Sequence, residues 1–119
     1  MEQILFIQTG TGMDVHGQDI TKAAVRAAEN AIWYNSIPGI EKMLPDGDVK
    51  NMKVTVRLAV PLDRKKVDVE KVKEAIPYGE VTVDVMDGGM ATSSGVILKD
   101  KEDDNDLMYM VNASVEVGY

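Results

Sequence analysis

Two apolar patterns of different period open the chain. Residues 3–9, QILFIQT, are apolar on both faces of an extended segment, which is typical of a strand covered on both sides. We therefore predict a strand in the middle of a sheet. Residues 19–35 place isoleucine and alanine at helical spacing, and Asp19 fits the N-cap position. The alanines of this predicted helix allow it to lie close to the sheet.

Further along, the same kinds of pattern predict a loop, a strand, a short helix and another strand. Residues 36–50 contain two prolines and two glycines and are predicted as a loop with one short helical turn, which could serve as a flap. Residues 52–60 alternate apolar and polar positions, which is the pattern of a strand with one face more exposed to solvent. A helix over 68–76, capped by Asp68, is followed by a strand over 80–86.

The pattern in the last part of the chain predicts a hairpin that has apolar residues on the face of the sheet not covered by helices. Segments 95–99 and 107–117 flank the acidic run 100–106, which we interpret as a solvated turn without an ion site. In the second segment Met108 and Met110 occupy positions where a solvated sheet face would carry polar residues. An apolar patch on an uncovered sheet face usually marks a contact surface, so we expect a homo-oligomer.

The order of predicted elements, β-α-β-α-β-β, together with a length of 119 residues, indicates one α+β domain spanning 1–119. We expect a single mixed sheet of four to five strands with two helices packed on one face. The other face of the sheet would then be the oligomer interface.

Composition and charge exclude several function classes. The chain has no cysteine, which rules out disulfides and thiolate metal sites and disfavours zinc. Its formal charge of −7 opposes a general nucleic-acid role, which depends on lysine and arginine. The apolar stretch within residues 1–7 is too short for a membrane span or a signal peptide, so we expect a cytoplasmic protein with no membrane partner.

The segment TGTGMDVHGQD, residues 9–19, joins the first predicted strand to the first helix and holds three glycines and the only histidine. Val15 stands where a dinucleotide fingerprint requires glycine, and no P-loop lysine follows, so we expect no cofactor. Free N–H groups before a helix favour an anionic or carbonyl ligand, and Asp14 with His16 would form an acid/base pair. The predicted ligand-binding residues are Gly10, Thr11, Gly12 and Gly17. Alternatively, the segment is a tight corner whose glycines take positive φ.

A second glycine-rich segment, MDGGMATSSG at residues 86–95, also follows a strand. Adjacent glycines let a ligand approach the backbone and hydroxyls donate to its oxygens, although Asp-Gly-Gly is also an ordinary turn sequence. The predicted ligand-binding residues are Asp87, Gly88, Gly89, Ser93 and Ser94. Asp14, His16 and Asp87 could together bind magnesium or manganese, but this ligand set is thin and we favour a metal-free site.

These motifs carry a family resemblance. The pattern of Gly10, Gly12, His16 and Gly17, with the later DGGM and the ending NASVEVGY, resembles a small family of conserved hypothetical proteins first catalogued from a Listeria reading frame. The resemblance covers nearly the whole chain and implies no activity. The element order is also similar to that of chorismate-mutase-like trimers, and more distantly to ring-opening amidohydrolase domains such as those of barbiturase, which place active sites between subunits or repeated units.

Two hypotheses about function follow. The first is a small enzyme, a hydrolase or lyase acting on a compact polar or anionic metabolite, with His16 in proton transfer, Asp14 orienting it, and Ser93 or Ser94 positioning the substrate. The second is a noncatalytic ligand-binding or structural module that assembles as a homo-oligomer. A proton-transfer partner for His16 inside a closed pocket would favour the enzyme.

Overall fold

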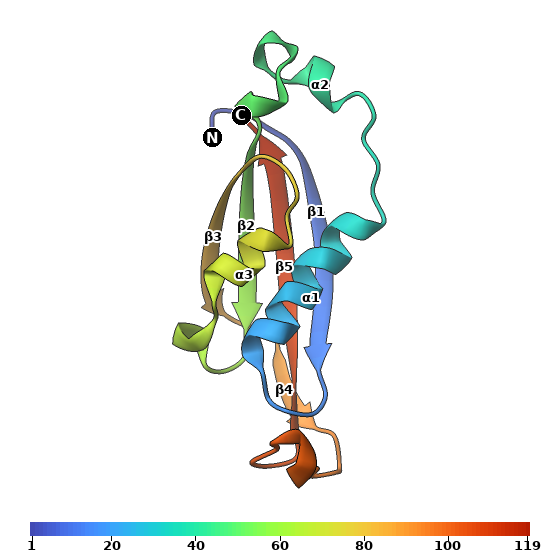
Figure 1. The fold of residues 1–119 in the computed structure, drawn as a ribbon, viewed down its shortest axis with the longest axis vertical. Coiled ribbons are helices and arrows are strands. Elements are labelled where there is room, and N and C mark those ends of the chain that lie inside the picture. Colours follow the sequence, from blue (N-terminus) through green and yellow to red (C-terminus); the bar gives the residue numbers. More distant parts are fainter.

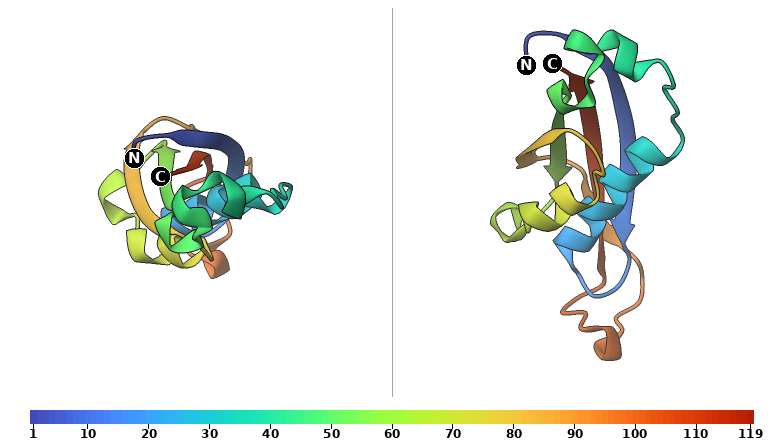
Figure 2. Two further views of the ribbon diagram at one scale, coloured as in Figure 1. Left: turned by 90° about the horizontal axis from the view of Figure 1, so that it is seen from above. Right: turned by 45° about the horizontal axis from the view of Figure 1, so that its top comes forward.

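A single five-stranded sheet with helices on one face makes up the body of the structure, a computed structural model that describes all residues 1–119 (Figure 1). In chain order the elements are β1 (Ile4–Asp14), α1 (Ile20–Trp33), α2 (Ile40–Met43), β2 (Lys53–Val60), α3 (Val69–Glu74), β3 (Glu80–Asp87), β4 (Met90–Ser93) and β5 (Leu107–Gly118). Both α1 and α3 lie on the same face of the sheet, as Figures 1 and 2 show. The expected α+β fold with one mixed sheet is confirmed.

The strand order is β1-β5-β2-β3, so the last strand lies between the first two. β5 is antiparallel to β1 and to β2, while β2 and β3 run parallel. Beyond the end of β2, the short strand β4 takes its place beside the first residues of β5. The molecule is long, 53 × 25 × 21 Å, with both chain termini at one end and the segments 15–19 and 94–106 at the other (Figure 1).

Two predictions about strands need correction. β1 is an edge strand, not a central one, because β5 inserts between β1 and β2; Ile7 on its outer side is 57% exposed. The partner of β5 in the hairpin is β4 and not the segment 95–99, which forms no strand because β4 already covers that edge. The short helical turn predicted within the loop 36–50 is present as α2, and two 3-10 turns, Pro45–Gly47 and Val49–Asn51, follow it.

The predicted helices are confirmed together with their caps. Asp19 caps α1 by accepting a hydrogen bond from the Lys22 N–H, and Asp68 caps α3 in the same way. None of the helices has the length and apolar character needed to cross a bilayer.

Gly10 and Gly12 lie within β1 under the alanine face of α1 and not in a loop. A Cβ on Gly10 would lie 2.8 Å from the Ala31 Cα, and one on Gly12 would lie 2.7 Å from the carbonyl carbon of Arg26. We call this contact the glycine–alanine seam; its helix side consists of Ala23, Ala27 and Ala31, all buried. The two glycines are therefore explained by close helix packing, and neither has positive φ.

The face of the sheet opposite the helices carries a row of methionines. Met13 and Met90 are both paired in register with Met110 on the central strand. Met90 is 55% exposed, and Met108 and Met110 are half-buried while their neighbours Tyr109 and Val111 are buried. The predicted alternation along β5 is thus confirmed, and the methionine row remains uncovered in a single chain.

The glycine–alanine seam should tolerate no added side-chain atom. We expect Gly12→Ala to lower the free energy of unfolding by about 2 kcal/mol or more, since its Cβ would overlap the α1 backbone. Gly39→Ala is the control, because nothing lies within 4 Å of a Cβ there. Thermal and urea unfolding should separate the two variants; equal stabilities would show that α1 moves away at little cost.

The uncovered methionine row leads us to expect a homo-oligomer. Light scattering after gel filtration should give a multiple of the 13.0 kDa chain mass, and Met110→Glu should shift the protein towards the single chain. Met43→Glu, which changes an exposed methionine on α2, should leave the mass unchanged. A wild-type protein that is monomeric at micromolar concentration would contradict this expectation.

Candidate functional site

The corner between β1 and α1 is organised by two aspartates. Asp14, the last residue of β1, is buried and accepts a hydrogen bond from the Asp19 N–H at 2.8 Å. Asp19 in turn caps α1, its Oδ1 accepting from the Lys22 N–H at 3.1 Å. Between them Gly17 and Gln18 have φ values of 102° and 50°, so the chain reverses sharply and His16 is carried to the end of the sheet.

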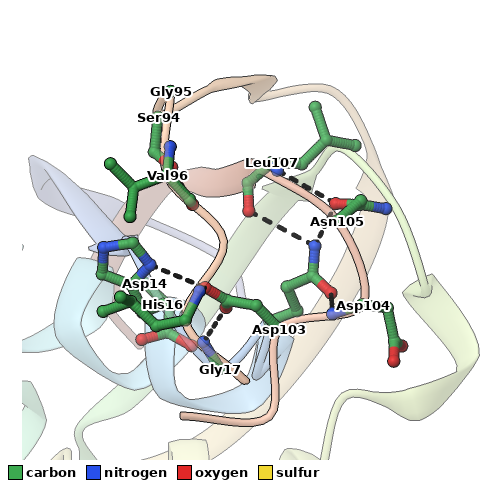
Figure 3. A network of polar contacts seen from close by, with 12 residues as sticks. Asp14, His16, Gly17, Ser94, Gly95, Val96, Asp103, Asp104, Asn105 and Leu107 are labelled. Carbon is green, nitrogen blue, oxygen red and sulfur yellow. Dashed lines mark hydrogen bonds and ion pairs between the residues drawn. The ribbon is translucent and has the colours of Figure 1, made fainter. Parts of the chain in front are cut away.

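His16 is paired with Asp103, a residue of the acidic run (Figure 3). The His16 Nδ1 lies 2.7 Å from the Asp103 Oδ2. The Asp103 carboxylate also accepts hydrogen bonds from the Gly17 N–H at 2.6 Å and the Leu98 N–H at 2.9 Å. Its side chain is only 1% exposed, whereas that of His16 is 25% exposed. A buried carboxylate with three donors therefore holds an accessible imidazole.

The same hydrogen bonds determine the ionisation of Asp103. The backbone N–H groups of Gly17 and Leu98 lower the pKa of Asp103; burial opposes them, and His16 adds to the lowering. Asp103 is therefore an anion at neutral pH and can only accept, so the Nδ1 of His16 carries the shared proton. In the neutral ring the lone pair is then on Nε2, which makes no hydrogen bond within the chain.

A second set of hydrogen bonds ties the same two segments together. Gln18 Nε2 donates to Asn105 Oδ1 and, at 3.4 Å, to the Leu107 carbonyl. Its Oε1 accepts from the Asp104 N–H at 3.0 Å. Segments 15–19 and 94–106 thus form one surface, which we call the tip.

The expected pairing of Asp14 with His16 is not found. The Asp14 carboxylate is used by Asp19 and lies 3.7 Å from Nη1 of Arg26, so it holds the corner rather than the imidazole. The orienting carboxylate is Asp103, within a run that we interpreted as a solvated turn. The sequence gives no sign that distinguishes Asp103 from the other acids of that run, because its burial depends on a contact 87 residues away.

The other predicted site residues separate into different surroundings. Ser93 Oγ donates to Asp106, and Ser94 Oγ donates to the Val96 carbonyl at 3.0 Å, so neither serine contacts His16. Gly17 joins the Asp103 network. Gly10 and Gly12 belong to the seam, and the Thr11 N–H donates to Asn30 Oδ1 at 3.0 Å, so these backbones are closed to a ligand.

The second glycine-rich segment is a turn between β3 and β4. A Cβ on Gly89 would lie 3.0 Å from the Ala59 carbonyl oxygen, and one on Gly88 would lie 2.7 Å from the Ala59 Cβ. Asp87 is exposed and faces Arg64 at 3.8 Å. No three or more histidine, aspartate or glutamate side chains are grouped so that they could hold a metal ion, so Asp14, His16 and Asp87 do not form the divalent site considered above.

His16 lies on an open surface. None of the four main clefts of the chain is lined by it. Of the two conditions expected for an enzyme, the proton-transfer partner is therefore present, while none of the main clefts encloses His16.

The fold and the tip define a class of protein: a one-sheet α+β domain with a histidine–carboxylate pair beside the end of its sheet. The chain belongs to the family described as "Conserved hypothetical protein (Lin0512_fam)", whose model matches residues 4–117. It is similar to the crystal structure of an FtsZ-like protein of unknown function from Nostoc punctiforme, with a TM-score of 0.86 and 36% sequence identity over 97% of this chain and 93% of that one. No protein of curated function matches the chain.

The lowered pKa of Asp103 predicts how the tip responds to acid. A carboxyl whose native pKa is depressed stabilises the fold above its unfolded pKa, near 3.9, and this contribution is lost as the pH falls through the native pKa. Asp103→Asn should therefore melt earlier than wild type at neutral pH, and the difference should shrink below about pH 4.

Asp100→Asn is the control for this experiment, because Asp100 lies in the same run but is exposed. Its melting curve should follow that of wild type at every pH. A constant gap between Asp103→Asn and wild type from pH 7 to pH 2 would contradict the assigned role of the ionised Asp103.

Proposed function

We propose that this protein binds a compact polar or anionic metabolite at the tip and acts on it as a hydrolase or lyase, with His16 as the proton-transfer residue. One observation carries the proposal: the 2.7 Å contact of the His16 Nδ1 with the buried Asp103. It supports the enzyme hypothesis because general acid–base catalysis requires a titratable group near neutral pH that is held in one orientation.

The pair has the properties of a positioned base. The carboxylate fixes the orientation of the ring and its tautomer, as second-shell carboxylates do for histidines in general. Because Asp103 is itself held by Gly17 and Leu98, rotation of the ring costs at least one hydrogen bond. The Nε2 is then available to remove a proton from a ligand or to return it.

The surroundings of His16 favour a polar ligand: the tip is acidic, and Arg26 is the nearby cation that an anionic group would contact. Arg26, 53% exposed, is held near the same end of the sheet by a 2.7 Å hydrogen bond from its Nη1 to the Met13 carbonyl. It supplies a cation that the carboxylate of Asp14, 3.7 Å away, only partly neutralises. A ligand on this surface would gain affinity from such charges and hydrogen bonds and from the exposed side chains of Val15, Val96 and Ile97.

A noncatalytic role is the second candidate, and a specific observation favours it. The contacts of His16 and Gln18 both join segment 15–19 to segment 94–106, so the pair also serves as a cross-link between them. In that case His16 closes the corner, and the tip is a structural or ligand-holding surface. The two candidates differ in what happens when the cross-link is weakened without changing the imidazole.

Variants at the tip can separate these candidates. The wild-type protein is screened by thermal shift against small carboxylates, cyclic amides and phosphorylated metabolites, and the hits are assayed for turnover. We expect His16→Ala to lose turnover by about a hundredfold or more and to recover part of it with added imidazole. Gln18→Ala is the matched control: it removes a comparable tie between the segments and should keep turnover.

The control decides the interpretation. Loss of turnover in both variants, without rescue by imidazole, would show that the cross-link and not proton transfer matters. Stabilisation by a hit that His16→Ala retains in full, with no turnover in any protein, would support the noncatalytic module.

A further inference from the structure

A cleft lies at the end of the molecule opposite the tip. On β1 the residues that follow Gly10 toward the termini on the helix-facing side are Gln8 and Phe6. Because α1 ends at Trp33, Gln8 and Phe6 are covered by the connecting segment 34–52 and not by a helix (Figure 1). This segment covers the two residues incompletely. A cleft of about 350 Å³ remains between β1, segment 34–52 and the turn that carries Tyr78.

The lining of the cleft is apolar and uncharged. Six of its eight residues are hydrophobic, and the other two are the amides Gln8 and Asn35. Burial raises the pKa of Tyr78, so its phenol stays neutral across the physiological range. A charged ligand would lose its hydration here without an opposite charge in return, which restricts the cleft to neutral molecules.

Gln8 is the polar group that this apolar surface leaves without a partner. The residue is only 6% exposed, and its Oε1 is the one buried side-chain oxygen or nitrogen of the structure with no hydrogen bond. A buried acceptor without a donor is costly, and native structures rarely keep one unless water or a ligand supplies the donor. A hydrophobic residue at this position would avoid the cost.

Asn35 adds a second acceptor to the lining. Its Nδ2 donates to the Ala31 carbonyl at 2.9 Å at the end of α1. The amide is thereby oriented so that Oδ1 remains available. The cleft thus combines an apolar wall of ligand size with two amide side chains in its lining.

We propose that this cleft binds a neutral small molecule with an apolar, ring-sized body and an N–H or O–H group, which Gln8 Oε1 accepts when the amide turns from its buried position toward the cleft. The inference is independent of the proposed function at the tip, since the two regions share no residue. Nothing in the sequence alone identified this site: the unpaired amide becomes visible only when the covering segment is placed over β1.

Indole and its N-methyl derivative provide a matched pair of probes. Both are neutral and apolar, but only indole has an N–H donor. We expect an ¹⁵N NMR titration of the full chain to show indole-induced shifts at Phe6, Ile40 and Tyr78, and an affinity about tenfold weaker for 1-methylindole. Indole-3-carboxylate, which is charged, should bind more weakly than indole.

A near-isosteric variant tests the role of Gln8. Gln8→Met should raise the melting temperature of the free protein, because it removes the unpaired acceptor, and should bind indole about tenfold more weakly, no better than 1-methylindole. Gln3→Met is the control; Gln3 is exposed and its amide donates to the Ile4 carbonyl. It should bind indole as wild type does.

The proposal is overturned if indole and 1-methylindole bind equally, if Gln8→Met leaves indole affinity unchanged, or if millimolar indole shifts none of the cleft residues. His16→Ala should bind indole normally. A failure of turnover at the tip and a failure of binding in the cleft are therefore distinguishable.

Discussion

The close approach of α1 to β1 is the constraint on which the rest of the molecule depends. Because Gly10 and Gly12 have no side chains, the helix backbone lies directly on the strand, and the alanines of its inner face are fully buried. This contact fixes where α1 starts and where it ends. The start requires the sharp corner that Asp14 and Asp19 hold, and the corner delivers His16 to the tip. The end at Trp33 leaves Gln8 and Phe6 without a helix above them, which creates the cleft.

The tip differs from the seam in the kind of interaction that holds it. The seam consists of backbone and methyl groups in contact, and its energy comes from packing, which varies little with pH. The tip depends on Asp103, whose carboxylate collects donors from two distant segments. Its strength therefore changes with ionisation. A chain of this kind can loosen its tip while the body of the sheet stays folded.

The sequence predicted those features that depend on local spacing. The caps Asp19 and Asp68, the alternation over 52–60 and the outward position of Met108 and Met110 are all as expected, because each follows from neighbours a few residues apart. The sequence did not reveal what depends on contacts between distant segments. Gly10 and Gly12 were predicted to lie in a loop, because the contact with α1 that requires glycine there is made by residues distant in the sequence. Asp103 is distinguished from the other acidic residues of its run only by its contacts with His16 and Gly17.

The place of β5 in the sheet has a consequence for how the chain reaches this structure. β1 and β2 both find their antiparallel neighbour in β5, which is synthesised after every other strand. Non-local pairing of this kind slows folding, and unpaired strand edges invite association between chains. While the polypeptide emerges from the ribosome, the apolar side of β2 and the alanine face of α1 lack the surface that later buries them. Assembly of the complete sheet therefore waits for β5, and in the interval before it the nascent chain depends on whatever keeps such surfaces apart.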